Sequence, residues 1–340
     1  MESVGFTFSA IRGVQAGMEY YVCMVPLCLL PKLFVFNDEK LSPEARAQRM
    51  LNKARIPEMR DYILDNLNSY VFSALTASVD AEIKFEKVNE NMGSGCDLGI
   101  VKIPLTAQFL INDGQHRKAA IEAAIKKKPV LQYEHIAIVL YEDMGLKRSQ
   151  QIFSDLNKHA IRPTKSLNIL YDNRDSFSIM LCELIEELPF FRNWVEKEHG
   201  TISNRSKALF TLSGLFRGSK ALTDGIEVAD YKQIVKEFWE KAYESMPDWQ
   251  DVVQGRMKSS RLREESICGH TIALLALGNV GHELLKKGRD FSRLERLRAI
   301  NWEKTAPEWQ GNVVLASKIS GTRASVKYLS DELINTVRGE

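Results

Sequence analysis

Cysteine is scarce in this sequence, with five residues among 340 and no Cys-x-x-Cys pair. Such a set forms neither the dense disulfide framework of small secreted domains nor the paired ligands of a structural zinc site. Long apolar runs are also missing, because Pro26, Pro31 and Lys32 interrupt the most apolar stretch, residues 18–36. No membrane span or signal peptide is expected there, and no metal site, so a reducing cytoplasm is the expected location.

Charge of one sign is lacking as well. The formal net charge is only +2, so any basic face for nucleic acid has to come from local clustering. The sequence has no Walker A motif, no Gly-x-Ser-x-Gly and no His-Glu-x-x-His, which leaves no common motif for phosphate transfer, acyl transfer or zinc-dependent proteolysis.

What is present is an ordinary globular composition, 44% hydrophobic and 26% charged, in a chain long enough for about two domains. The first half alternates strand-like and helix-like segments, including an apolar strand at 106–111 followed by a helix at 114–128. From residue 176 onward, apolar residues recur at helical spacing. We therefore predict an α+β domain over residues 1–172 and an all-helical domain over residues 173–340.

The most informative segment is Asp113-Gly114-Gln115-His116-Arg117, at the start of the predicted helix. Asn112 or Asp113 can cap this helix, and Gly114 lets the backbone approach a ligand closely. Three cations then follow in the first turn, where each costs roughly 0.3–1 kcal/mol against the helix dipole. An anion held on free backbone N–H groups, with Arg117 bidentate to it, would offset that cost. The alternative is a capped helix whose cations point into water.

These five residues are also the signature of the DGQHR-domain family, and the chain resembles the DndB-type members that accompany bacterial DNA phosphorothioation. The motif is similar to the Gly-x-x-Arg segment of ParB and sulfiredoxin-like proteins, where a glycine and an arginine reach nucleotide phosphates. His116 stands where ParB proteins usually carry arginine. Downstream, Asn157 and Lys158 precede Pro163 as in the ParB segment.

The resemblance covers residues 15–170 most fully, and the helical half resembles DndB-type proteins through the Ser203–Lys207 segment and Trp302 followed by Trp309. It implies a ParB-like N-terminal domain and a nucleotide or phosphate site. The residues predicted for that site are Asp113, Gly114, Gln115, His116, Arg117, Asn157 and Lys158.

Several further residues are candidates for contacting DNA. Gln48, Arg49, Asn52 and Arg55 belong to one predicted helix, on which residues 48, 52 and 55 share a face. In the helical half, the segment 203–220 contains Arg205, Lys207, Arg217 and Lys220 and no acid. Both sets suit phosphate contacts, although a solvated polar face is the ordinary alternative. Cys28 is a candidate for DNA contact or redox chemistry, and its alternative is simple packing.

Two functions are consistent with these patterns. The first, as the resemblance implies, is a DNA-binding regulator that binds the promoter of its own modification operon, represses it, and acts beside other phosphorothioation proteins, with homo-oligomerisation left open. The second is a ParB-like component that hydrolyses a nucleoside triphosphate such as ATP with Mg²⁺ and that could couple hydrolysis to DNA nicking. For the second, only Asp113 and Asp155 are near enough in sequence to hold the metal, and neither has a clear partner carboxylate.

Overall fold

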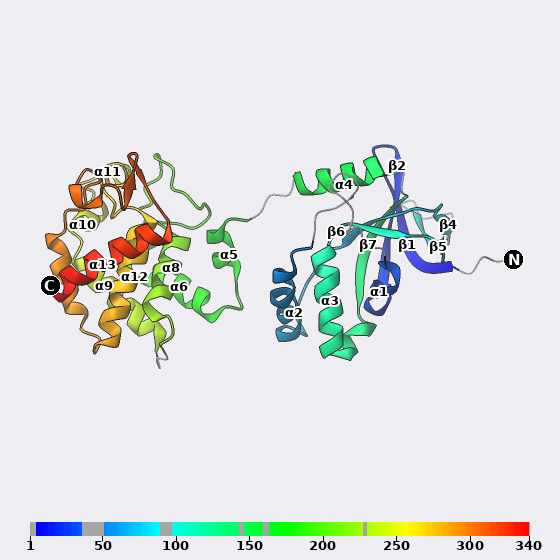
Figure 1. Ribbon diagram of the computed structural model, residues 1–340, viewed down its shortest axis with the longest axis horizontal. Coiled ribbons are helices and arrows are strands. Elements are labelled where there is room, and N and C mark those ends of the chain that lie inside the picture. The colour runs from blue at the N-terminus through cyan, green and yellow to red at the C-terminus, as the bar shows by residue number, and fades with distance from the viewer. Residues whose placement is uncertain are drawn as a thin grey trace. The chain divides into compact units, whose positions relative to one another are not determined.

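The computed structural model describes residues 5–35, 51–88, 97–142, 146–158, 163–226 and 230–339. Its contacts divide the chain into two compact units, residues 1–161 and residues 162–340, which we call the sheet unit and the helical unit. Helix α5 (Lys165–Tyr171) packs against α6 and α8 and therefore belongs to the helical unit. The prediction of an N-terminal α+β region followed by a helical region is confirmed (Figure 1).

The sheet unit is built on a seven-stranded sheet in the order β4-β5-β1-β2-β7-β3-β6. All neighbouring strands are antiparallel except β3 and β7, which are parallel. β1 and β2 form a hairpin whose two loop residues, Ala16 and Gly17, both have positive φ, as a tight hairpin turn requires. The strands are β1 (Gly5–Gln15), β2 (Met18–Pro26), β3 (Leu75–Val79), β4 (Lys84–Lys87), β5 (Asp97–Pro104), β6 (Phe109–Asp113) and β7 (His135–Glu142).

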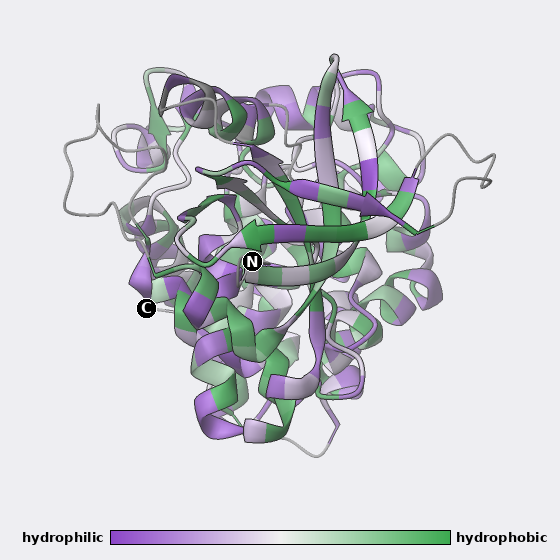
Figure 2. Cartoon of the chain, turned by 90° about the vertical axis from the view of Figure 1, so that its right-hand side faces the viewer, coloured by the Kyte–Doolittle hydropathy of each residue, from purple (hydrophilic) through white to green (hydrophobic). Residues whose placement is uncertain are grey.

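Buried and half-buried residues alternate along the middle of β5 and β7. Figure 2 shows that the strands of the sheet carry both hydrophobic and hydrophilic residues. The buried residues form one core with α3 (Gln115–Lys127), which itself packs against α2 (Ile56–Asp65). β3 is buried along its whole length. The remaining elements are η1 (Leu27–Leu29), α1 (Leu30–Leu33), η3 (Lys53–Arg55), η4 (Pro129–Tyr133) and α4 (Leu146–Lys158).

The helical unit has its own core, centred on Trp239, Phe191 and Phe238. Its longer helices are α6 (Ser176–Glu187), α8 (Leu212–Thr223), α9 (Tyr231–Glu244), α12 (Thr271–Lys286) and α13 (Arg323–Arg338). The shorter helical elements are α7 (Pro189–Arg192), α10 (Pro247–Val253), α11 (Ser259–Glu265), η5 (Phe291–Ala299) and η6 (Pro307–Trp309). Two small ribbons join them, β8 (Val195–Glu196) with β9 (Phe210–Thr211) and β10 (Val314–Leu315) with β11 (Lys318–Ile319).

Helices α8 and α12 make the closest helix pair of this unit, and they run parallel. Gly214 faces Thr271, Gly218 faces Leu274, and Gly281 faces Leu222, so both chains advance in the same direction. A Cβ at Gly278 would lie only 2.2 Å from the carbonyl oxygen of Gly218. Glycine is required at this crossing because the two backbones touch. The N-termini of both helices therefore lie side by side.

Two local details concern helix boundaries. Residues Leu30–Leu33, within the apolar stretch 18–36, form a helical turn. Residues 207–210 are not helical, because α8 begins only after Thr211, whose hydroxyl accepts a hydrogen bond from the Gly214 amide at 3.1 Å and so caps the helix. Among the described residues, no helix combines the length and the apolar character needed to cross a membrane.

Candidate functional site

The DGQHR motif lies where β6 ends and α3 begins, at one edge of the sheet. Gly114 is the N-cap residue, with φ of 105°, and no side chain caps the helix. The predicted caps do other things: Asn112 is fully buried and accepts a hydrogen bond from the Ser78 hydroxyl at 2.8 Å, and Asp113 ends the strand. The positive φ of Gly114 makes the sharp turn from strand to helix that neither predicted cap could make at this position.

Arg117 is committed to acceptors within the protein. Its guanidinium donates to the carbonyl oxygens of Ser73 and Ala74, each at 2.6 Å, and to the Ser73 hydroxyl. It also pairs with the Asp113 carboxylate at 2.5 Å. Lys118 pairs in turn with Glu122 at 3.0 Å. Arg117 and Lys118 therefore need no bound anion, since neighbouring carboxylates and carbonyl oxygens already offset their charge.

His116 joins this motif to the upstream segment. Its side chain is buried, and its Nε2 accepts a hydrogen bond from the Asn52 amide at 3.0 Å, so that nitrogen carries no proton in this arrangement. Asn52 is itself the N-cap of a 3₁₀ turn, because its side chain accepts from the Ala54 amide at 3.1 Å. No continuous helix therefore runs through residue 52. Residues 52 and 55 do not share the helix face that was predicted for residues 48, 52 and 55. Gln48 and Arg49 lie outside the described residues.

A cavity of about 310 Å³ opens at this junction. All five motif residues line it, together with Arg55, Phe72 and Phe153. Of the other two residues predicted for the same site, Lys158 is exposed at the end of α4 and does not line the cavity. The side chain of Asn157 lies outside the described residues. Cys28 is a half-buried free thiol in η1 and does not line the cavity.

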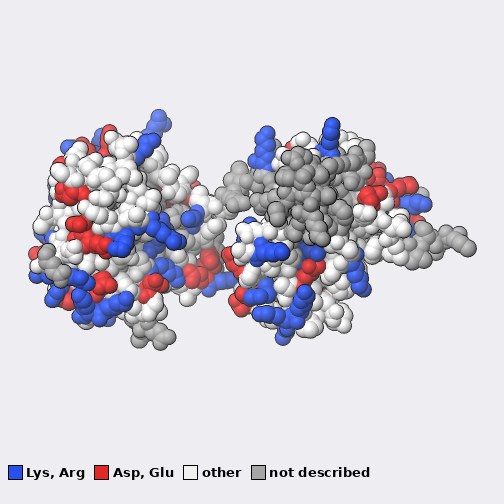
Figure 3. All heavy atoms as spheres, in the orientation of Figure 1, with Lys and Arg blue, Asp and Glu red and all other residues white. Residues whose placement is uncertain are grey.

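The four basic candidates of the helical unit differ in their surroundings. Arg205 and Lys207 are exposed on the loop before α8, and within the described ranges neither side chain has a hydrogen bond or an ion pair. Arg217 is exposed on α8 beside Asn279 and His282 of α12. Lys220 packs over the Phe177 ring, 4.1 Å from its centroid. On the face seen in Figure 3, basic side chains of this unit gather in groups that acidic ones interrupt.

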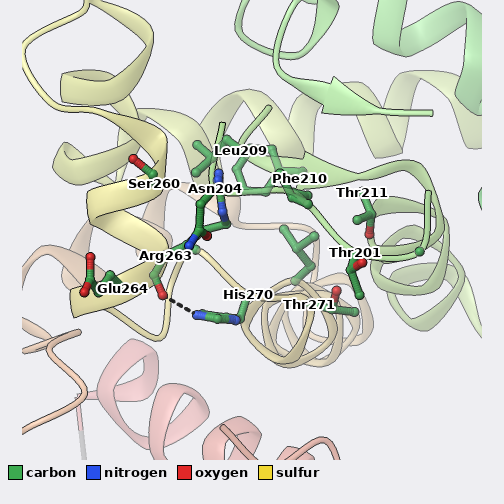
Figure 4. Close-up of a pocket in the computed structure, with 14 residues that line it drawn as sticks. Thr201, Asn204, Leu209, Phe210, Thr211, Ser260, Arg263, Glu264, His270 and Thr271 are labelled. Carbon is green, nitrogen blue, oxygen red and sulfur yellow. Dashed lines mark hydrogen bonds between the residues drawn. The ribbon is translucent and has the colours of Figure 1, made fainter. Parts of the chain in front are cut away.

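A second cavity, of about 440 Å³, lies in the helical unit at the N-termini of α8 and α12 (Figure 4). Asn204, Thr211, Arg263, His270 and Thr271 are among its lining residues. This site was not predicted from the sequence, because the site forms only when α11 and α12 lie beside the loop at 200–211. The sequence does contain two glycine pairs at helical spacing, Gly214 with Gly218 and Gly278 with Gly281. Such pairs are typical of two closely packed helices.

The strand-to-helix turn of the DGQHR motif is expected to depend on glycine. In a Gly114→Ala variant the added Cβ would meet Leu75 Cδ2 at 2.4 Å, and the positive φ adds further strain. We expect a loss of about 2–3 kcal/mol in the stability of the sheet unit, measured by chemical denaturation. Gly17→Ala is the matched control, because Gly17 also has positive φ but has nothing within 4 Å of an added Cβ. Equal losses in both variants would mean that contact with Leu75 contributes nothing.

Comparison with known proteins adds one finding to this geometry. A family model described as DndB, DNA-sulfur modification-associated, matches residues 8–339, nearly the whole chain. Neither the curated proteins nor the solved structures contain a match.

Proposed function

Because this chain belongs to the DndB family of DNA-sulfur modification-associated proteins, we propose that it is a DNA-binding regulator that recognises and represses the promoter of its own modification operon. Membership implies a role in the DNA sulfur modification system, with DNA and other proteins of that system as partners. The regulatory role is the more specific step and is the one to be tested.

The observation that carries this proposal is the pair of uncommitted cations Arg205 and Lys207. Most basic side chains on the helical unit are used internally: Lys232 pairs with Glu183 and Glu187, and Arg261 with Glu265. Arg205 and Lys207 are exposed, and within the described ranges neither side chain donates a hydrogen bond or forms an ion pair. Exposed cations of this kind suit phosphate oxygens of DNA, which fix the position of a protein on the duplex.

The second candidate function is nucleotide hydrolysis at the DGQHR cavity, with the sheet unit acting as a ParB-like domain and ATP with Mg²⁺ as its ligand. The uncapped first turn of α3 favours it, because backbone N–H groups at a helix N-terminus can hold phosphate oxygens. The carboxylates argue against it: Asp113 is engaged by Arg117, and Asp155 accepts from Gln151 at 2.6 Å. We therefore place the regulator first.

A competition gel shift run beside an ATPase assay separates the two candidates. For a sequence-specific regulator we expect the operon promoter to bind at least about a thousandfold more tightly than random DNA at physiological salt, without nucleotide. Robust ATP turnover combined with equal affinity for both DNAs would overturn the regulator proposal.

The same assay tests the proposed role of the two cations. In an Arg205→Ala, Lys207→Ala double variant we expect affinity for promoter and random DNA to fall in parallel and the salt slope to decrease by up to about 2, since each phosphate contact contributes about 0.9. Arg261→Ala with Lys327→Ala is the charge-matched control, because both are exposed but ion-paired within their helices. A loss confined to the promoter would mean that Arg205 and Lys207 read bases.

A further inference from the structure

The cavity at the N-termini of α8 and α12 contains a cationic side chain without an acidic partner. Arg263 is 9% exposed, and its guanidinium donates to the carbonyl oxygens of Ala208 at 2.5 Å and Ser203 at 3.1 Å. These bonds use two of its five N–H groups. No carboxylate pairs with Arg263 among the residues that the structure describes. A buried cation without a counter-charge is costly, so this arrangement favours an anion beside it.

Two other basic residues, Lys304 and His270, bond to the backbone of Arg263. The Arg263 carbonyl oxygen accepts both from Lys304 Nζ at 2.6 Å and from His270 Nε2 at 2.7 Å. Burial lowers the pKa of Arg263, of Lys304 and of His270. At Lys304 the Glu264 carboxylate opposes this shift, so one acid lies within electrostatic range of these basic groups.

The two parallel helices add their dipoles to this region. Neither α8 nor α12 has an acid in its first turn. At α8, the Thr211 hydroxyl already caps the Gly214 amide and Ser166 Oγ accepts from the Ser213 amide. At α12 the N-cap residue His270 makes no side-chain cap, because its ring is turned to Arg263 instead. The Ala273 amide donates to the His270 carbonyl oxygen at 3.0 Å, so the amides of Thr271 and Ile272 are the ones left to hold an anion.

We propose that this cavity binds a phosphoryl group, held by Arg263, by the amides of Thr271 and Ile272 and by the hydroxyl of Thr271. Among the described residues, the only acid lining the cavity is Glu264, whose carboxylate points away from the wall formed by Thr201, His270 and Thr271 (Figure 4). A volume of about 440 Å³ exceeds the needs of a phosphate alone and falls in the usual range of small-molecule sites.

Two sources can deliver such a group, a free nucleotide or the backbone of DNA. Apolar lining by Ile202, Leu209 and Leu274 would suit the nucleoside part of a nucleotide. The uncommitted Arg205 and Lys207 follow Asn204, a lining residue, on the same loop, and would suit neighbouring phosphates of a DNA strand. The inference concerns the phosphoryl group and does not depend on the regulator proposal.

Thr271→Asp is the decisive variant, because it places a carboxylate in the cavity while favouring the helix N-terminus. We expect binding of inorganic phosphate and of AMP to the full chain, measured by calorimetry at constant ionic strength, to weaken by at least about tenfold. Thr322→Asp is the matched control: Thr322 caps α13, a helix of the same 16-residue length outside the cavity, and Asp caps equally well. We expect its binding to be unchanged. Arg263→Lys, which keeps the charge but loses the forked geometry, is expected to weaken binding about fivefold or more.

A gel shift with duplex DNA identifies the source. If Thr271→Asp weakens phosphate, AMP and DNA together, and AMP competes with DNA, the cavity holds a backbone phosphate. If phosphate and AMP binding are lost while DNA affinity is unchanged, the source is a free nucleotide. Phosphate and AMP affinities in Thr271→Asp equal to those of the wild type, or no measurable binding of either by the wild type and no effect on DNA, would overturn the proposal.

Discussion

Replacing Gly278 with leucine is expected to unfold the helical unit while the sheet unit stays folded. The Cβ alone would stand 2.2 Å from the carbonyl oxygen of Gly218 and 3.1 Å from the Cβ of Ala221, so helix α8 itself must move. Helix α8 packs with the buried Trp239, whose indole N–H donates to the Ser219 hydroxyl at 2.9 Å. Displacement of α8 therefore disturbs the centre of the core, and we expect a loss above about 4 kcal/mol.

Gly278→Ala gives the graded form of this test. Alanine in a helix interior is normally favoured over glycine by about 1 kcal/mol, so a destabilised alanine variant shows that the close crossing outweighs helix propensity. Gly321→Ala, where nothing lies within 4 Å of an added Cβ, is the control. Thermal unfolding followed by near-ultraviolet circular dichroism reports on the helical unit, because all five tryptophans of the sequence belong to it. They are Trp194, Trp239, Trp249, Trp302 and Trp309. A stabilised Gly278→Ala variant would contradict the close approach of α8 and α12.

Local patterns were sufficient to predict the elements around the DGQHR motif. The apolar strand before it and the helix after it follow from side-chain periodicity, whereas the predicted caps of the helix do not. The pairing of the strands did not follow, because the parallel contact of β3 with β7 joins segments about sixty residues apart and depends on packing across the whole sheet.

The role of Arg117 illustrates the same limit. One of its partners, Asp113, stands only four residues earlier, at the end of β6, so this pair is local in the sequence. Its other acceptors, at Ser73 and Ala74, are not local, since they reach the motif only when β3 pairs with β6. The cavity of the helical unit was missed for a similar reason, as Arg263 meets Ser203 and Ala208 only in the folded chain.

Arg117→Ala is expected to destabilise the sheet unit by about 2–3 kcal/mol, because it leaves two carbonyl oxygens and the 45% exposed Asp113 carboxylate without their donor. The Arg117 side chain is only 14% exposed, so water cannot replace all these bonds. Lys102→Ala is the control from the same unit: Lys102 pairs with Glu86, the two side chains are 42% and 58% exposed, and we expect a loss of about 0.5 kcal/mol. Similar losses in the two variants would contradict the structural role of Arg117.

Adding ATP with Mg²⁺ to the same unfolding experiment decides whether the motif also binds a nucleotide. A ligand that binds only the folded protein stabilises it by about 2.7 kcal/mol at a hundredfold excess over its Kd. If the motif acts through its internal bonds alone, ATP leaves wild type and Arg117→Lys equally unaffected. If ATP raises the midpoint of the wild type but not that of Arg117→Lys, Arg117 holds phosphate in addition to Ser73 and Ala74. If Arg117→Lys also loses ATP turnover together with that stabilisation, nucleotide hydrolysis would replace the regulator as the first candidate function. Because Asp113 and Arg117 already satisfy each other in the structure, we expect no ATP-dependent shift at this motif.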